Sequence, residues 1–122
     1  MRTLWHLWLL IGCVGILLGC EPKGDELADL KDGQKLHQDC VRLMEQFPSG
    51  EISKQIWPRS IRELKPIRVT REPNNIRILI KQERGKFTVG YDVFANLQLS
   101  PPTQGVWVQK TKTRGVYIFK QY

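Results

Sequence analysis

Residues 76–94, IRILIKQERGKFTVGYDVF, decide the fold of this chain. Ile76, Ile78 and Ile80 recur at every second position, the spacing at which side chains point to one face of a β-strand. After a polar turn at residues 83–86, the alternation resumes in a second strand, with apolar side chains at Phe87, Val89, Tyr91 and Val93. Two strands joined by so short a turn must pair antiparallel. The stretch therefore predicts a hairpin with one continuous apolar face.

A helix is expected before the hairpin, over residues 26–47. Apolar residues recur along one side of it at intervals of three or four, at Leu36, Cys40, Leu43, Met44 and Phe47. Asp32 is a candidate N-cap for a helix that restarts at Gly33, and Pro48 follows the helix end. This stripe and the apolar face of the hairpin are the largest apolar surfaces in the chain. We therefore expect the helix to pack on that face.

The remaining elements complete a single domain over residues 26–122. Pro58 and Pro66 bracket a short helix near residues 58–64. Further strands are expected at residues 67–70, 106–110 and 116–120, with a longer loop at 96–104. Gly90 lies inside a predicted strand, which indicates a bulge or a close approach of the helix. The predicted fold class is α+β, with an N-terminal helix packed on a four- to five-stranded antiparallel meander sheet.

The first twenty residues have the pattern of a targeting segment. A short positive start at residues 1–3 precedes an apolar run at residues 4–18, LWHLWLLIGCVGILL. The run is shorter than the ~20 apolar residues that a membrane-spanning helix needs. It ends in LLGC at residues 17–20, which resembles the lipobox of bacterial lipoproteins, where the cysteine is lipidated and becomes the new N-terminus. We predict a signal peptide at residues 1–19, a lipidated Cys20 and a short tether at residues 20–25.

Two alternatives to this anchor stay open. Residues 10–13, LIGC, match the same pattern, and lipidation at Cys13 would leave an apolar stretch on the mature chain. The apolar run is alternatively an uncleaved anchor helix at the N-terminus. All three interpretations hold the domain at a bacterial membrane, and the lipobox resemblance implies palmitate or similar acyl chains. Glu21 is not the aspartate that retains some lipoproteins in the inner membrane, so we favour the outer membrane, facing the periplasm, in a Gram-negative cell.

The net charge of +7 is unevenly distributed along the chain. Residues 52–122 hold fourteen Lys and Arg against four Asp and Glu, whereas residues 20–51 hold four basic and eight acidic residues. This asymmetry indicates an anionic partner, which in a cell envelope would be lipid headgroups, an acidic glycan or an acidic protein, and not nucleic acid. The candidate contacts are Arg59, Arg62, Lys65, Lys110, Lys112 and Arg114. The alternative is a solvated basic surface with no partner.

A second apolar surface is expected on the face of the sheet away from the helix. Trp107 alternates with Val106 and Val108, so its side chain points to the face opposite theirs. Four aromatic residues are assigned to this second face: Trp107, Tyr117, Phe119 and Phe94. A solvated sheet face is normally polar, so this apolar excess indicates a binding surface. The alternative is that the loop at residues 97–104 folds over it.

No strong catalytic motif is present, and we predict no metal and no cofactor. Once the signal peptide is removed, His37 is the only histidine, and with Cys40 it supplies too few ligands for a metal site. We expect His37 on the solvated side of the helix and Cys40 in the core, where a thiol is inert. The alternative is an enzyme that acts on envelope glycan or lipid through a carboxylate pair. Its candidate carboxylates, all expected on exposed positions or turns, are Glu63, Glu72, Glu83 and Asp92.

Residues 56–66, IWPRSIRELKP, with GYDV at 90–93 and GVYIF at 115–119, resemble small uncharacterised bacterial exported lipoproteins. The shared feature is a WPxxIxxLxP element before a β-meander. The resemblance covers most of the mature chain and implies no activity. The sequence as a whole predicts a membrane-anchored envelope lipoprotein whose domain is a non-enzymatic binding or interaction module.

Overall fold

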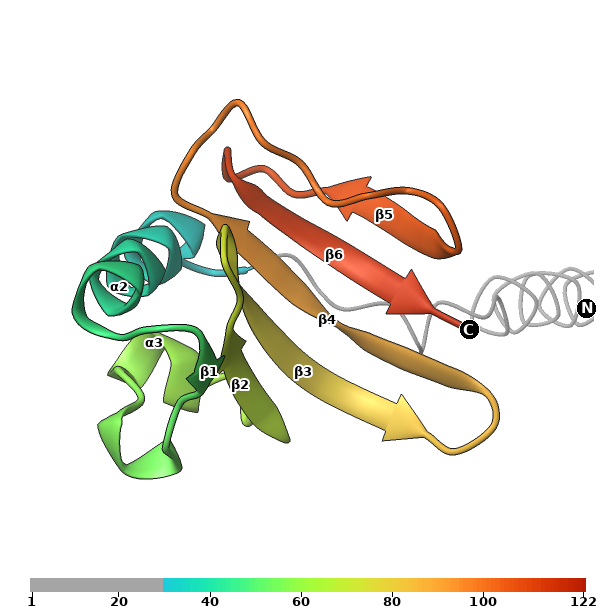
Figure 1. The fold of residues 1–122 in the computed structure, drawn as a ribbon, viewed down its shortest axis with the longest axis horizontal. Helices are drawn as coiled ribbons and strands as arrows, with labels where there is room; N and C mark the ends of the chain where they lie inside the picture. Colours follow the sequence, from blue (N-terminus) through green and yellow to red (C-terminus); the bar gives the residue numbers. More distant parts are fainter. Residues whose placement is uncertain (1–29) are drawn as a thin grey trace, which may run out of the picture.

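The computed structural model describes residues 30–122, so the predicted signal peptide, Cys20 and the tether lie outside the described residues. Residues 30–122 form one main helix and one six-stranded antiparallel sheet, which confirms the predicted α+β class. The elements in chain order are α2 (Gly33–Gln46), β1 (Gly50–Glu51), the 3-10 helix η1 (Lys54–Ile56), α3 (Arg59–Arg62), β2 (Arg68–Arg71), β3 (Asn75–Glu83), β4 (Phe87–Phe94), β5 (Val106–Lys110) and β6 (Val116–Gln121). Helices α2 and α3 gather at one end of the sheet (Figure 1).

Helix α2 begins at Gly33, where the sequence predicts a restart, and residues 26–29 of the predicted range 26–47 lie outside the described residues. Asp32 is the N-cap, as predicted, and its Oδ1 accepts a hydrogen bond of 3.0 Å from the backbone N–H of Lys35. The first helical position must be a glycine, because a Cβ atom on Gly33 would lie 1.9 Å from Oγ1 of Thr113. The start of the helix is therefore pressed against the turn between β5 and β6.

The end of α2 is held by a basic side chain from the sheet. Nη2 of Arg71 donates a hydrogen bond of 3.1 Å to the carbonyl oxygen of Met44, one of the carbonyls that the helix itself leaves unpaired. A cation at this position also interacts favourably with the helix dipole. Phe47 then takes an extended conformation before Pro48, which ends the helix one residue before the predicted boundary.

The sheet order is β1-β2-β3-β4-β6-β5, and each neighbouring pair is antiparallel. Strands β2, β3 and β4 follow the predicted meander, but β6 lies between β4 and β5, and the unpredicted β1 makes the sheet six-stranded instead of four- to five-stranded. The long loop at residues 95–105 lets the chain skip one position, and β6 then returns beside β4 (Figure 1). Composition explains which strand is interior: Val116, Ile118 and Phe119 of β6 are buried, whereas Trp107 of β5 is exposed.

Strand β3 contains a bulge at Ile80. Leu79 pairs with Gly90 and Lys81 pairs with Val89, so one residue of β3 has no partner on β4. The extra residue reverses the alternation beyond it. Lys81 consequently points to the same face of the sheet as Val89, which unbroken alternation would not allow.

Gly90 marks a close approach, but not of the helix. A Cβ atom on Gly90 would lie 2.0 Å from the carbonyl oxygen of Ile78 and 3.0 Å from Cε1 of Phe119. The neighbours that exclude a side chain are thus the β3 backbone and a ring from β6. The predicted bulge exists on the partner strand opposite Gly90, whereas the predicted approach of the helix is wrong.

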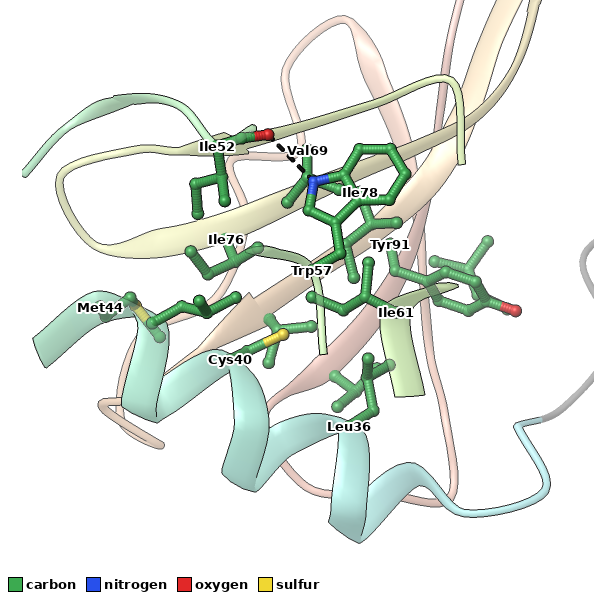
Figure 2. Close-up of a cluster of buried hydrophobic side chains, with 14 residues drawn as sticks. Leu36, Cys40, Met44, Ile52, Trp57, Ile61, Val69, Ile76, Ile78 and Tyr91 are labelled. Carbon is green, nitrogen blue, oxygen red and sulfur yellow. Dashed lines mark hydrogen bonds between the residues drawn. The ribbon is translucent and has the colours of Figure 1, made fainter. Parts of the chain in front are cut away.

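The apolar stripe of α2 packs on one face of the β3–β4 hairpin, as predicted (Figure 2). Leu36, Cys40 and Met44 point toward the sheet and join the buried Ile76 and Ile78 in one cluster. We call this side of the sheet the helix face, and the opposite side the far face. Directly paired residues on neighbouring strands share a face, so the register assigns every strand residue to one of them.

The segment between α2 and β2 closes the edge of the core. Its buried side chains, Ile52, Trp57 and Ile61, belong to the same cluster (Figure 2). Nε1 of Trp57 donates a buried hydrogen bond of 2.9 Å to the carbonyl oxygen of Ile52. This bond holds residues 52–57 in a closed loop. The WPxxIxxLxP element thus packs its apolar positions into the core and leaves its charged positions outside.

Candidate functional site

The aromatic surface predicted on the far face is buried rather than exposed. Phe119 is 0% exposed and Phe94 is 5% exposed, and the Phe94 ring meets the Tyr117 ring edge-on with centroids 5.8 Å apart. Trp107 does not belong to this group. It pairs with Lys120 on the helix face, whereas Val108 pairs with Phe119 on the far face. The prediction that all four aromatic residues form one surface is wrong.

An ion pair covers the far face beside Phe119. The guanidinium of Arg77 lies over the Phe119 ring, 4.2 Å from its centroid. Its Nε donates a hydrogen bond to Oδ1 of Asp92 and its Nη2 donates one to Oδ2, each of 2.9 Å. Asp92 is 1% exposed. The prediction that Asp92 is exposed is therefore wrong. Alternation along β4 puts Asp92 on this face. It does not reveal that Arg77 and Phe119 cover the Asp92 carboxylate.

Electrostatics in this pair follow from its burial. Desolvation raises the pKa of Asp92, and the hydrogen bonds from Arg77 oppose that rise. The same hydrogen bonds raise the pKa of Arg77 above its usual range, so the guanidinium stays charged. The bidentate geometry is that of a structural ion pair, in which each carboxylate oxygen of Asp92 accepts a hydrogen bond from Arg77.

Two of the candidate carboxylates meet at this pair. Nδ2 of Asn75 donates hydrogen bonds of 2.9 Å to Glu72 and 3.3 Å to Asp92, and Glu72 lies 3.6 Å from Nε of Arg77. Both carboxylates accept a hydrogen bond from Asn75, only Asp92 accepts from Arg77, and neither carboxylate lines the cavities described below. The other two form exposed ion pairs on their own elements, Glu63 with Arg59 and Glu83 with Lys86, each at 3.0 Å.

His37 and Cys40 also hold the fold together. His37 is half-buried, and its Nε2 lies 2.8 Å from the carbonyl oxygen of Phe94, which corrects the expected solvated position. The contact fastens α2 to the end of β4. Cys40 is fully buried as predicted, and desolvation raises the pKa of its thiol far above the ordinary value. Within residues 30–122 no three His, Cys, Asp or Glu side chains lie close enough together to hold a metal ion.

The six basic residues predicted to meet an anionic partner are all exposed, but they do not form one patch. Arg59 and Arg62 lie on α3, and Lys65 lies beyond the helix end with a positive φ of 52°, so the expected three-residue row breaks there. The other three belong to β5 and the following turn: Lys110, Lys112 and Arg114. Figure 1 places α3 and the β5–β6 turn on opposite sides of α2.

A different surface brings aromatic and basic side chains together. Its members lie on the helix face at the end of the sheet away from the helices, and we call them the aromatic–lysine cluster: Lys81, Phe87, Trp107, Lys120 and Tyr122. One row of paired positions crosses four strands, from Lys81 through Val89 and Lys120 to Trp107. Nζ of Lys120 lies 4.6 Å from the Phe87 ring centroid and 5.4 Å from that of Tyr122, and Nζ of Lys81 lies 5.4 Å from that of Phe87.

Only part of this cluster was accessible to sequence reasoning. Trp107 is 44% exposed and was assigned to a binding surface, although to the wrong face. Lys120 follows Phe119, so alternation puts the two on opposite faces. The sequence pattern does not predict that Lys81 lies on the helix face, because the bulge at Ile80 decides its face. Tyr122, 81% exposed, lies just beyond the last predicted strand.

A cavity of about 810 Å³ lies on the helix face between the start of α2 and α3. Its lining residues are Leu30, Lys31, Asp32, Lys35, Leu36, Arg59, Ser60, Glu63, Leu64 and Tyr91. Asp39 ties its walls together, since it accepts a hydrogen bond of 2.6 Å from Oγ of Ser60 and lies 3.2 Å from Nζ of Lys35. Leu30, where the described chain begins, thus lines the same cavity as Tyr91. A smaller cavity of about 420 Å³ lies between Trp57 and β1 and β2.

Neither helix in the described part of the chain is long and apolar enough to cross a membrane. Comparison of the whole chain with protein-family models, with curated proteins and with solved structures found no match.

Proposed function

We propose that this protein is a lipid-anchored bacterial envelope protein whose sheet domain is a non-enzymatic binding module for an anionic partner. The anchor is the acyl group on Cys20, at the end of the apolar run and the LLGC motif. Two or more acyl chains, at ~0.8 kcal/mol per buried methylene, hold a protein stably at a membrane. The outer membrane, facing the periplasm, is the proposed location in a Gram-negative cell.

One contrast in the structure supports the binding role. The groups that are suited to chemistry hold the fold: Asp92 in its ion pair, His37 on the Phe94 carbonyl and Cys40 in the core. Most Lys and Arg side chains of the described chain are instead exposed, although several of them, such as Arg59 and Lys86, also pair with a carboxylate. A long-range attraction between this surface and an anionic partner follows from the excess of Lys and Arg.

The anchor is tested by growing cells that express the full chain in the presence of labelled palmitate. The wild type is expected to carry the label and to fractionate with membranes in moderate salt. Cys20→Ala should carry no label, because no other thiol lies at the predicted cleavage site. Cys13→Ala is the matched control and should label like the wild type. Label lost in Cys13→Ala and kept in Cys20→Ala would move the anchor to Cys13, and an unlabelled wild type would overturn the proposal.

The partner is tested by crosslinking the anchored wild type in membranes and recovering what is attached. A specific anionic partner, recovered at low salt and reduced at moderate salt, is expected because salt screens attraction between exposed charges. Recovery of nothing at either salt concentration would contradict the binding role and favour a solvated basic surface.

A further inference from the structure

We propose that the aromatic–lysine cluster docks the anchored domain on the anionic lipid headgroups of its own membrane. This inference deepens the proposed function and rests on it, because it assumes the acyl anchor on Cys20. It names the partner of the cationic surface and gives the domain an orientation. The helix face, at the end of the sheet away from α2 and α3, turns toward the bilayer (Figure 1).

The side chains in the cluster are the types that suit a membrane–water interface. Trp107 and Tyr122 are 44% and 81% exposed, and each ring combines an apolar body with a polar tip, as in the aromatic belts of membrane proteins. The ammonium groups of Lys81 and Lys120 lie over the Phe87 ring, 5.4 and 4.6 Å from its centroid, so the ring holds two cationic groups together on this surface. Anionic headgroups attract Lys side chains held this close to them.

The route of the chain brings this face toward the anchor. The described chain begins at Leu30, which lines the same cavity as Tyr91 on the helix face. Val89 is two residues from Tyr91 on β4, which at the usual rise of a strand is about 7 Å. Val89 pairs with Lys120 and so lies in the row of paired positions that runs from Lys81 to Trp107. Cys20 is ten residues before Leu30, which at full extension corresponds to roughly 35 Å. This limit keeps the domain close to the bilayer, and the described chain begins on the helix face.

Charge also favours contact through the domain rather than through the tether. Residues 20–29 contain four acidic residues and one lysine, so anionic headgroups repel this segment. A cationic contact must therefore come from the folded part. Within it, the aromatic–lysine cluster is the surface where lysines and exposed aromatic rings coincide, whereas the Arg59 and Arg62 surface on α3 carries charge without an exposed aromatic ring beside it.

The test uses the lipidated mature protein, purified from cells and reconstituted into vesicles with brominated acyl chains, which quench nearby tryptophan. The vesicles contain phosphatidylcholine alone or phosphatidylcholine with phosphatidylglycerol. Loss of the two signal-peptide tryptophans is checked by mass. Trp57 is 7% exposed, so quenchable emission should belong to Trp107 and should vanish in Trp107→Phe. We expect loss of emission in the anionic vesicles and little loss in phosphatidylcholine.

Two double variants with the same change in charge separate docking from general attraction. Lys81→Glu/Lys120→Glu should lose the quenching, and Arg59→Glu/Arg62→Glu should keep it, with unchanged melting temperatures as evidence of folding. Equal loss in both variants, or equal quenching in both vesicle types, would overturn the proposed face. A lipidated protein that stays on the vesicles without quenching would overturn docking and leave the anchor intact, as for a glycan or protein partner. A protein without acyl chains that leaves the vesicles would overturn the proposed function itself.

Discussion

Gly90 lies at the tightest point of the sheet. A Cβ atom added to it would lie 2.0 Å from the carbonyl oxygen of Ile78 on β3 and 3.0 Å from Cε1 of the Phe119 ring on β6. Arg77 then covers the same Phe119 ring and holds Asp92 beneath it. Single positions on the far face thus depend on neighbours from three strands at once.

Gly90→Ala is expected to destabilise the domain by at least ~1–3 kcal/mol, the usual cost of overpacking, because the obstructing atom belongs to the backbone of β3 and cannot rotate away. Urea unfolding measures the loss. Gln82→Ala, an exposed change on the neighbouring strand, should stay within ~0.5 kcal/mol of the wild type. Equal stability of Gly90→Ala and the wild type would mean that β3 and β4 are further apart.

Arg77→Met should unfold more easily by ~3–5 kcal/mol near neutral pH, because it leaves the buried Asp92 carboxylate without a counter-ion. Burial raises the pKa of Asp92 above its ordinary value of 3.8 and the hydrogen bonds from Arg77 oppose that rise, so their loss in the variant raises the folded pKa further. The deficit relative to the wild type is then smallest in acid, where Asp92 is protonated in the folded state of both proteins. It grows as pH rises from the folded pKa of the wild type to the higher folded pKa of the variant, and it is constant above that.

The measurement is urea unfolding of both proteins at a series of pH values from acidic to neutral. The control compares Arg77→Met/Asp92→Asn with Asp92→Asn, and the deficit between these two should not change with pH, because neither has the titrating group. A constant deficit in Arg77→Met itself would show that Asp92 finds another partner.

Residue roles were the least predictable part of the molecule. His37 and Phe94 are 57 residues apart in the chain, and Arg77 and Asp92 are 15 apart, so neither contact leaves a local pattern. The sequence predicts an exposed position for Asp92, but its exposure depends on the side chains that cover it. Cys40 was predictable, because its place on an apolar helical stripe implies burial on its own.

At the scale of elements, α2 and the β3–β4 hairpin form because their apolar periods match the helix and the strand. The helix is fixed at both ends by other parts of the chain, by Thr113 at its start and by Arg71 at its end. The bulge at Ile80 had no counterpart in the pattern, since an extra residue interrupts the period only once. That single shift moved Lys81 to the helix face and made the candidate site different from the predicted one.

Leu36→Ala should cost ~2–5 kcal/mol, since Leu36 is 1% exposed and its loss leaves a cavity between α2 and the sheet. Gln38→Ala, on the exposed side of the same helix, should leave stability nearly unchanged. Thermal and urea unfolding of the three proteins compare them. Similar losses in both variants would indicate that α2 is held by its ends rather than by its apolar stripe.

At the scale of the whole molecule, the class of fold was predictable and the strand order was not. One helix and one sheet with apolar surfaces of similar extent bury both surfaces by packing on each other, which gives a two-layer α+β fold. The position of β6 depends on a loop of eleven residues, 95–105, whose composition does not reveal that it passes over one strand position. The buried cluster draws its members from residues 36–118, far from Cys20 in the chain.

Cys20→Ala, expressed with a conventional cleavable signal in place of residues 1–19, should therefore melt at the wild-type temperature although it is released from the membrane. Circular dichroism of the released variant and of the detergent-purified wild type gives the comparison. The double variant Cys20→Ala/Leu36→Ala is the control. Its melting temperature should be lower, which shows that the measurement detects a loss of stability. A lower midpoint for Cys20→Ala alone would mean that the anchor supports the fold.

The interior place of β6 has a consequence for biogenesis. Strand β6 is later in the chain than every strand it joins, yet it supplies the pairing partner for both β4 and β5. A polypeptide that crosses an export channel from its N-terminus would carry β4 and β5 through before the strand that connects them. Strand β5 then has no neighbour in the sheet until β6 has also emerged. One late step thus completes the sheet: the pairing of β6 with both β4 and β5.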